Sequence, residues 1–463
     1  MQRQAELEAP PAGTTRSHHA PPRLRLSRRR ALVAAATGFT APLGALNVYG
    51  AAVYGFRYPQ VTDAAVYYGA ATIGLRFGWA HIYDAASQAA VWPGLHIYQT
   101  TWIQSPVAAW LFAPLTSLSL SQAFDLWAPL MFLMLGLTWW LLSLGSVADR
   151  IGQLTALVAL WGVGIGMSSG QLVFLVGACI AIAWWLLRKG RQGWAGMVLA
   201  FAIAVKPQSA MLVPPALLLA GYRRAFVTWA ACSLMVAVVA AVILTPDGLL
   251  QLLVKARSAS SDPRAWNAVP GMSFAGLLGA GVLATVLQAA AAAGSLVVAW
   301  KARWAGPELP IASALVGSHL LTPYLHEPEV FMIAVAAMLF MRSGPGLPKA
   351  MFPVALWLAA EVAHIPVVGY APLLVLEVLW LPLMATVQPQ PPAIAPTMRN
   401  GSLPLETSSG SGSSGDVSER SSSHAKNLSS GLRFFVLLSR IVPMSGGYLD
   451  SSSSRIERCV TGP

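Results

Sequence analysis

Long apolar segments with few or no charges recur along this chain and leave little choice of fold. Only 10% of its residues are charged, against about 25% in an ordinary soluble domain. A helix needs about 20 mostly apolar residues to cross the hydrocarbon of a bilayer. Backbone amides must be paired internally there, and the alternating pattern of barrel strands is not seen. The sequence therefore predicts an all-α, polytopic transmembrane helical bundle.

Three regions follow from composition. Residues 1–30 are polar and rich in Pro and Arg, which predicts a disordered, basic cytoplasmic tail. Residues 388–463 are rich in Ser, Gly and Pro, which predicts a second disordered tail. Between them, residues 31–387 form the predicted membrane domain, with about twelve spans. We place them at about 31–54, 103–120, 125–147, 151–166, 170–187, 194–220, 225–245, 274–300, 309–322, 329–341, 350–364 and 370–387.

The basic N-terminus predicts a cytoplasmic start, because cytoplasmic loops carry an excess of Lys and Arg. Twelve alternating spans then place both termini in the cytoplasm and the loops at 55–102 and 246–273 outside. This route also puts the basic cluster at 188–191 outside, against the same rule. If the segment at 194–220 is instead a hairpin broken at Lys206-Pro207, the basic cluster can return to the cytoplasm. The number of crossings earlier in the chain is then inconsistent unless part of 55–102 also crosses the membrane.

The net charge of +12 does not indicate a nucleic-acid-binding protein, because much of it lies in the two tails. Cys179, Cys232 and Cys459 are too far apart in the sequence to suggest a disulfide framework or a zinc site. We expect a multi-pass protein of the cell membrane, surrounded by lipid and not bound to nucleic acid.

Ionisable residues that interrupt apolar runs mark candidate sites, because they are costly at membrane depth. Asp63 follows the first span and begins an amphipathic stretch that predicts a helix at the membrane interface, on the first extracytoplasmic loop. Its carboxylate could act as a general base on a hydroxyl at the membrane surface. It could equally be the N-cap of that helix.

Two further polar breaks are candidates for substrate binding. Lys206 precedes a proline inside an apolar run, where it could hold a phosphate or extend from a short turn towards the interface. Gln171 follows Gly170 between two spans and could bind a sugar hydroxyl or a neighbouring helix.

The remaining candidates lie in loops. His326 and Glu327 stand in a proline-bounded break late in the chain, where they could position a substrate or belong to a solvated loop. The basic residues of the long loops could grip an anionic headgroup or simply be solvated. These candidate substrate-binding residues are Arg57, Lys255, Arg257 and Arg264.

Several motifs are missing from the sequence. It has no phosphate-binding loop of the Gly-x-x-x-x-Gly-Lys-Ser/Thr type and no His-Glu-x-x-His metal site. It also has no Asp-x-Asp pair of the kind that holds a metal and a nucleotide-sugar. A metal-dependent nucleotide-sugar transferase is therefore disfavoured, and we expect neither a metal nor a cofactor.

Short motifs in a fixed order cover about residues 45–345. They are Asp63-Ala-Ala-Val-Tyr-Tyr-Gly-Ala-Ala, Gly78-Trp-Ala-His-Ile-Tyr83-Asp84, Ser105-Pro106, Gly170-Gln171-Leu-Val-Phe174-Leu175, Ala195-Gly196, Lys206-Pro207-Gln208 and Thr322-Pro323-Tyr324-Leu325. Together they resemble glycosyltransferase family 87, whose members are polytopic enzymes that use polyprenyl-phosphate sugars. The sequence departs from that pattern at Leu172, where the family often has Asn, and at His326-Glu327-Pro328-Glu329.

The resemblance implies a GT-C fold with its active site between the bilayer and the first extracytoplasmic loop. It implies that Asp63 is the general base and that a hexose, with mannose the expected sugar, passes from a polyprenyl-phosphate donor to a lipid or glycan acceptor. We expect inversion at the sugar, without a metal. Lys206 or the arginines of the second loop would stabilise the leaving phosphate.

Two other functions remain open from the sequence. A secondary transporter or lipid flippase could use buried charges such as Lys206 and Glu377 for ion coupling, although transporters usually show internal repeats. A membrane scaffold without chemistry would scatter its polar breaks around the helices and would not gather them at one cavity.

Overall fold

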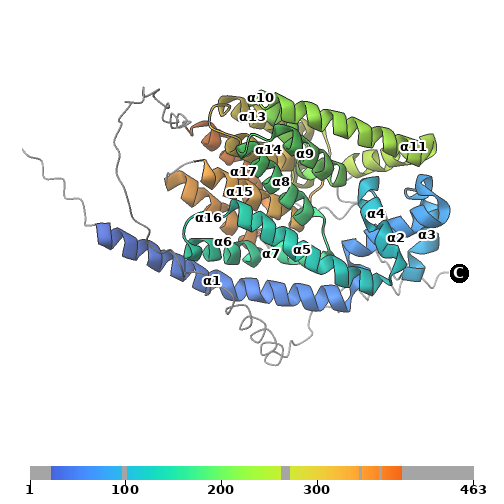
Figure 1. Cartoon of the computed structure of the whole chain (residues 1–463), viewed down its shortest axis with the longest axis horizontal. Helices are drawn as coiled ribbons and strands as arrows, with labels where there is room; N and C mark the ends of the chain where they lie inside the picture. The colour runs from blue at the N-terminus through green and yellow to red at the C-terminus, as the bar shows by residue number, and fades with distance from the viewer. Residues whose placement is uncertain (1–21, 96–101, 262–271, 344–346, 364–367, 388–463) are drawn as a thin grey trace, which may run out of the picture. The chain divides into compact units, whose positions relative to one another are not determined.

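In the computed structural model, the described residues are 22–95, 102–261, 272–343, 347–363 and 368–387, and all regular structure in them is helical (Figure 1). Residues 1–395 form one compact unit, and the second unit, 396–463, lies outside the described residues. The α-helices are α1 Pro22–Arg57, α2 Asp63–Phe77, α3 Ala85–Val91, α4 Pro106–Phe112, α5 Leu120–Leu142, α6 Val147–Ala159, α7 Trp161–Ser169, α8 Val173–Arg188, α9 Gln192–Val205, α10 Val213–Leu219, α11 Arg223–Ser261, α12 Phe274–Leu278, α13 Val282–Lys301, α14 Glu308–Leu321, α15 Val330–Arg342, α16 Leu347–Val362 and α17 Ala371–Ala385.

The first helix begins earlier than the composition indicated. α1 starts at Pro22 and includes the basic residues up to 30, which we had assigned to a disordered tail. Proline is favoured in the first turn of a helix, and the Arg and Leu residues that follow are good helix formers. The rest of the N-terminal tail and the predicted tail at 388–463 lie outside the described residues.

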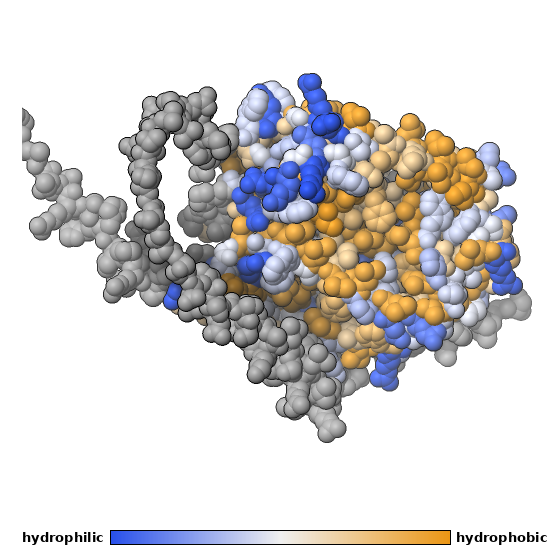
Figure 2. All heavy atoms as spheres, in the orientation of Figure 1, coloured by the Kyte–Doolittle hydropathy of each residue, from blue (hydrophilic) through white to orange (hydrophobic). Residues whose placement is uncertain are grey.

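Four of the described helices are long and apolar enough to cross a membrane. They are Arg30–Arg57 of α1, α5, Arg223–Ser258 of α11, and α13. α6 and α7 add a fifth candidate, bent by 67° between the two helices, and six shorter apolar helices complete the set. An integral membrane bundle is thus supported, while the count of twelve spans stays a prediction. Figure 2 shows hydrophobic residues across the middle of one face and hydrophilic residues mostly towards its two ends.

Two segments predicted as single spans form broken helices in the structure. The segment at 103–120 becomes α4 and the short 3-10 helix η4 (Ala113–Ser117), which pack against α2, where the hydroxyl of Tyr68 donates to the carbonyl of Leu118 at 2.7 Å. The segment at 194–220 divides at Lys206 into α9 and α10. Proline at 207 has no N–H to donate, so the helix cannot continue through it.

Basic residues gather at one end of the bundle. Nε of Arg188 lies 3.6 Å from Oε1 of Glu308. The guanidinium of Arg342 lies over the ring of Trp184 and donates to the carbonyl of Leu141 at 3.3 Å. These contacts gather the ends of α5, α8 and α15 with the start of α14 at one end of the bundle. The turn after α7, the break after α9 and the start of α2 meet at the other.

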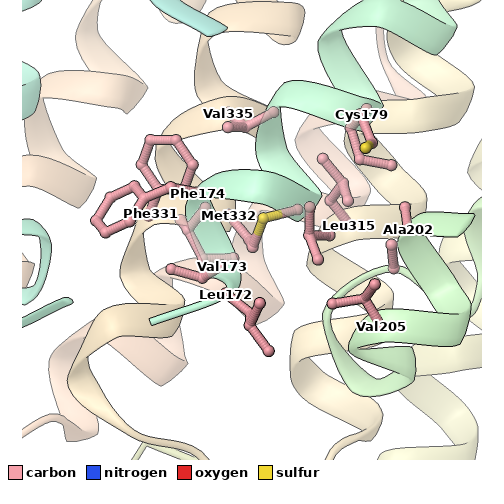
Figure 3. Packing of buried hydrophobic residues seen from close by; sticks show 14 of the residues in the cluster. Leu172, Val173, Phe174, Cys179, Ala202, Val205, Leu315, Phe331, Met332 and Val335 are labelled. Carbon is pink, nitrogen blue, oxygen red and sulfur yellow. The ribbon is translucent and has the colours of Figure 1, made fainter. Parts of the chain in front are cut away.

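Buried hydrophobic residues of α8, α9, α14 and α15 pack against one another where these helices meet (Figure 3). The rings of Phe174 and Phe331 pack with their centroids 4.9 Å apart. Leu172, Val205 and Phe331 all belong to this buried cluster, and each is one or two residues away from a polar residue of the candidate site. The apolar core therefore fixes the backbone from which the polar side chains project.

Candidate active site

Asp63 is the first residue of α2. The residue before it, Thr62, caps the helix, because its hydroxyl accepts from the backbone N–H of Ala65 at 3.2 Å. The alternative reading of Asp63 as the N-cap is therefore wrong, and its carboxylate is left for other contacts. Most of α2 is buried, so it is more enclosed than a helix lying at the membrane interface.

The turn between α7 and α8 carries Gln171 towards Asp63. Gly170 adopts a left-handed conformation with φ +75°, and a Cβ at this position would lie 2.6 Å from the Cβ of Ala64. The indole of Trp127 donates to the carbonyl of Gly170 at 2.9 Å. A glycine is thus required both by the backbone conformation and by the close approach of α2.

The side-chain amide of Gln171 joins three residues from two other elements. Its Nε2 donates to Oδ2 of Asp63 at 2.5 Å. Its Oε1 accepts from Nζ of Lys206 at 2.8 Å and from the hydroxyl of Tyr67 at 3.3 Å. Gln171 therefore contacts both Asp63 and Lys206, and these three residues were among those predicted from the sequence to line one site.

The ammonium of Lys206 is deeply buried and paired. Its side chain is 4% exposed, and its Nζ forms an ion pair with Oε1 of Glu329, whose side chain is also 4% exposed. The other carboxylate oxygen of Glu329 accepts from the hydroxyl of Ser209 at 2.9 Å. A buried cation needs such a partner, because an unpaired charge in the interior is very costly.

Tyr67 completes the contacts of Gln171. Burial raises the pKa of its phenol well above the ordinary value, and the carboxylates of Asp63 and Glu329 add to the effect. The phenol is therefore protonated at neutral pH and remains a hydrogen-bond donor to the amide of Gln171. Its ring packs against Phe112, with the centroids 5.2 Å apart.

The segments predicted to be the long outer loops contact each other beside this cluster. Lys255, near the end of α11, donates to Oε1 of Gln88 in α3 at 3.3 Å. Gly248 of α11 approaches Ala80 so closely that a Cβ would lie 2.8 Å from the Ala80 carbonyl oxygen. In addition, the hydroxyl of Ser273 donates to the carbonyl of Pro323 at 2.7 Å.

Other predicted residues make fewer contacts. Arg57 and Arg257 are exposed, and the guanidinium of Arg57 lies 5.6 Å from the centre of the Tyr58 ring. The side chains of His326 and Glu327 are partly exposed and make no hydrogen bond or ion pair with another described residue. Arg264 lies outside the described residues.

Glu329, Tyr67 and Ser209 were not among the predicted site residues. A signal for Glu329 was present, because a lysine buried in an apolar run must find an anion. The sequence offered both Glu327 and Glu329 three or fewer residues after His326, and only the fold distinguishes them. Tyr67 lies one helical turn after Asp63, so the spacing on α2 indicated a shared face.

An apolar groove lies on another side of the bundle, and none of its lining residues belongs to this cluster. This groove beside α1, with a volume of about 660 Å³, is lined by residues of α6, α15 and α16 such as Leu157, Met338 and Trp357. Among the described residues, no group of three or more His, Cys, Asp or Glu side chains is close enough to hold a metal ion.

Comparison with known proteins identifies the family. The model of glycosyltransferase family 87 matches residues 102–323, a region that contains Gln171 and Lys206. A search of curated proteins gave no match, and a search of solved structures gave none. The matched region, together with the ordered motifs and the helical membrane bundle that carries them, shows that this chain belongs to glycosyltransferase family 87.

Proposed function

We propose that this glycosyltransferase moves a hexose, with mannose the expected sugar, from a polyprenyl-phosphate donor to a lipid or glycan acceptor on the extracytoplasmic face of the cell membrane. The observation that carries the proposal is the contact between the carboxylate of Asp63 and the buried cluster of Gln171, Lys206 and Glu329. A partly exposed carboxylate held by a rigid polar cluster meets the requirements for a general base.

In the proposed reaction, the acceptor hydroxyl attacks the anomeric carbon of the sugar in line with the bond to phosphate. The new carbon–oxygen bond forms as the bond to the phosphate oxygen breaks, and the electron pair leaves with the phosphate. The hydroxyl proton passes to the carboxylate of Asp63. A single displacement of this kind inverts the configuration at the anomeric carbon.

The negative charge on the leaving phosphate needs preorganised cations. The charge of Lys206 is already balanced by Glu329, so we assign the phosphate to Arg57, Lys255 and Arg257. Arg57 and Arg257 are exposed, and Lys255 lies where α11 contacts α3. Each lies near the C-terminal end of a long apolar helix, α1 or α11, so a phosphate at the membrane surface can reach them while the polyprenyl chain remains in lipid.

The distribution of basic residues supports the extracytoplasmic location. Arg188 and its neighbours lie at the end of the bundle opposite the Asp63 cluster, and cytoplasmic ends of spans are enriched in Lys and Arg. The basic residues near that end are Arg150, Arg188, Lys189, Arg191, Arg223, Arg224, Lys301, Arg303 and Arg342.

The test uses membranes that contain the full chain, supplied with radiolabelled polyprenyl-phosphate mannose. Wild-type membranes should transfer label to an endogenous glycolipid or glycan, and Asp63→Asn should reduce transfer by about 10²-fold or more, the scale of general-base catalysis. Asp125→Asn, at an exposed carboxylate on α5, serves as the matched control and should transfer normally.

Two outcomes would reject the proposal. Full transfer by Asp63→Asn would remove the general base. Movement of the labelled lipid across the bilayer with no transfer of sugar would favour the lipid flippase that the sequence had left open. Repeating the assay with polyprenyl-phosphate arabinose or glucose identifies the sugar if mannose is not the one transferred.

A further inference from the structure

The side-chain amide of Gln171 is held in one orientation by its neighbours. A carboxylate accepts hydrogen bonds and an ammonium only donates them. The amide nitrogen must therefore face Asp63 and the amide oxygen must face Lys206, as the 2.5 Å and 2.8 Å contacts show. Reversing the amide would set oxygen against oxygen at Asp63 and hydrogens against the ammonium at Lys206.

We propose that Glu329, Lys206 and Gln171 form a positioning relay that fixes the carboxylate of Asp63 for proton abstraction. The inference rests on the proposed role of Asp63 as the general base and deepens it. It changes the assignment of Gln171 and Lys206, which become residues that act through Asp63. Neither residue is required to touch the sugar or the phosphate.

The far end of the relay is immobilised. Ser209 donates to Oε2 of Glu329 at 2.9 Å, while Oε1 of the same carboxylate pairs with Lys206. Both charged side chains are 4% exposed. Glu329 is followed directly by Val330 and Phe331, which are buried in the core against α8. Because these groups cannot move independently, Lys206 presents one N–H to Gln171 in a fixed direction.

At the other end of the relay, one carboxylate oxygen of Asp63 remains available to the acceptor. Gln171 occupies Oδ2 of Asp63, and no other described residue forms a hydrogen bond with Oδ1. The two charged residues of the relay, Lys206 and Glu329, are buried, whereas Asp63 is partly exposed. Oδ1 is therefore the atom that receives the acceptor proton, with its lone pairs held in a constant direction.

Geometry of this kind affects turnover more than binding, because a displacement of about 1 Å in a catalytic group can cost about 10²-fold in rate. In the transfer assay with polyprenyl-phosphate mannose, Gln171→Leu should lower kcat by about 10²-fold. KM for the donor should stay within about twofold of the wild-type value, because the amide touches no donor atom.

The exchange of the two charges provides a sharper test. The double variant Lys206→Glu, Glu329→Lys keeps a buried ion pair, so the melting temperature of the bundle should stay close to that of the wild type. It places a carboxylate beside Oε1 of Gln171, however, and so forces the amide to turn over. The amide oxygen then faces Asp63, and kcat should fall as far as in Gln171→Leu.

A matched control comes from Gln153 at the opposite end of the bundle, where its amide bridges the Leu144 backbone. Gln153→Leu should lower thermal stability but leave kcat unchanged. Lys206→Arg keeps a donor towards Gln171 and should recover part of the activity that Lys206→Met loses.

The outcomes separate the relay from the proposed function. If Asp63→Asn transfers normally, the proposed function fails. If Asp63→Asn is inactive while Gln171→Leu or the charge exchange keeps wild-type kcat, the function stands and the relay is overturned. A loss confined to donor KM would also overturn it, because Gln171 would then bind substrate directly.

Discussion

His319 Nδ1 lies 2.7 Å from Oε2 of Glu377, and this buried pair joins α14 to α17. Only 3% of the His319 side chain is exposed, and none of the Glu377 side chain. The pair is notable because α17 lies wholly beyond residue 323, where the match to the family ends. It attaches α17, the last of the described helices, to α14, which is followed directly by the Thr322-Pro323 break.

Removing one member of this pair should destabilise the protein. Glu377→Leu leaves the His319 ring buried without its hydrogen-bond partner, which we expect to cost about 1–3 kcal/mol. Thermal unfolding of the detergent-solubilised protein, followed by tryptophan fluorescence, measures the loss. His319→Leu combined with Glu377→Leu should recover much of it, because a buried pair can be replaced by apolar side chains. A double variant no more stable than the single one would contradict this account.

The turn at Gly170 makes a second prediction with an internal control. Gly170 and Gly190 have nearly the same φ angle, +75° and +73°, but a Cβ at Gly190 would have no atom within 4 Å. Gly190→Ala should therefore cost only the roughly 1–2 kcal/mol of a left-handed alanine. Gly170→Ala adds a clash with Ala64 and displaces Gln171, so it should lower both the melting temperature and sugar transfer. Equal effects of the two variants on transfer would disprove the role of the turn.

The helical bundle could be predicted from the sequence because the bilayer permits few alternatives. The breaks within it could be predicted only in part. The break at Lys206-Pro207 was one of two alternatives from the sequence, and α9 ends at Val205 because Pro207 interrupts the segment. The segment at 103–120 packs on α2 because Tyr68 and its neighbours bury it, and this outcome depends on tertiary contacts, which hydropathy does not encode.

The candidate site was predicted in part. The sequence marked Asp63, Gln171 and Lys206 because polar groups at membrane depth are costly, and the structure brings them into contact. It did not distinguish Glu329 from Glu327 as the partner of Lys206. The 3-10 helix η7 (Glu327–Glu329) turns one glutamate into the core and leaves the other partly exposed, and a turn of three residues has no periodicity from which to predict this.

The contact between α11 and the first loop makes a third prediction. Gly248→Ala adds a Cβ 2.8 Å from the carbonyl oxygen of Ala80, and overpacking of this kind typically costs about 1–3 kcal/mol. Because Lys255 and Arg257 follow on the same helix, we expect weaker donor binding. KM for the polyprenyl-phosphate donor should rise by about tenfold, which corresponds to about 1.4 kcal/mol.

The control for that variant is Gly136→Ala in α5, where a Cβ meets no atom within 4 Å. It should stabilise the helix by up to about 1 kcal/mol, since alanine is the better helix former, and should leave the donor KM unchanged. If Gly248→Ala also leaves donor KM unchanged, the cations of α11 do not meet the phosphate.

Asp84 makes the order of the first loop depend on pH. The hydroxyl and backbone N–H of Ser87 both donate to its carboxylate, at 2.7 and 2.8 Å, and these bonds lower the pKa of Asp84 below its ordinary 3.8. Because the folded-state pKa is depressed, the ionised cap stabilises α3 above pH 3.8, and this contribution is lost as pH falls through the lower value.

Hydrogen exchange in α3 measures this effect directly. Asp84→Asn retains a side chain that can cap the helix but removes the titration. At neutral pH the wild-type amides of α3 should exchange more slowly than those of Asp84→Asn, and the difference should vanish as the pH falls below 3.8. Comparing the two proteins at each pH cancels the intrinsic pH dependence of exchange. A difference that persists or grows at low pH would show that the carboxylate of Asp84 does not control the order of α3.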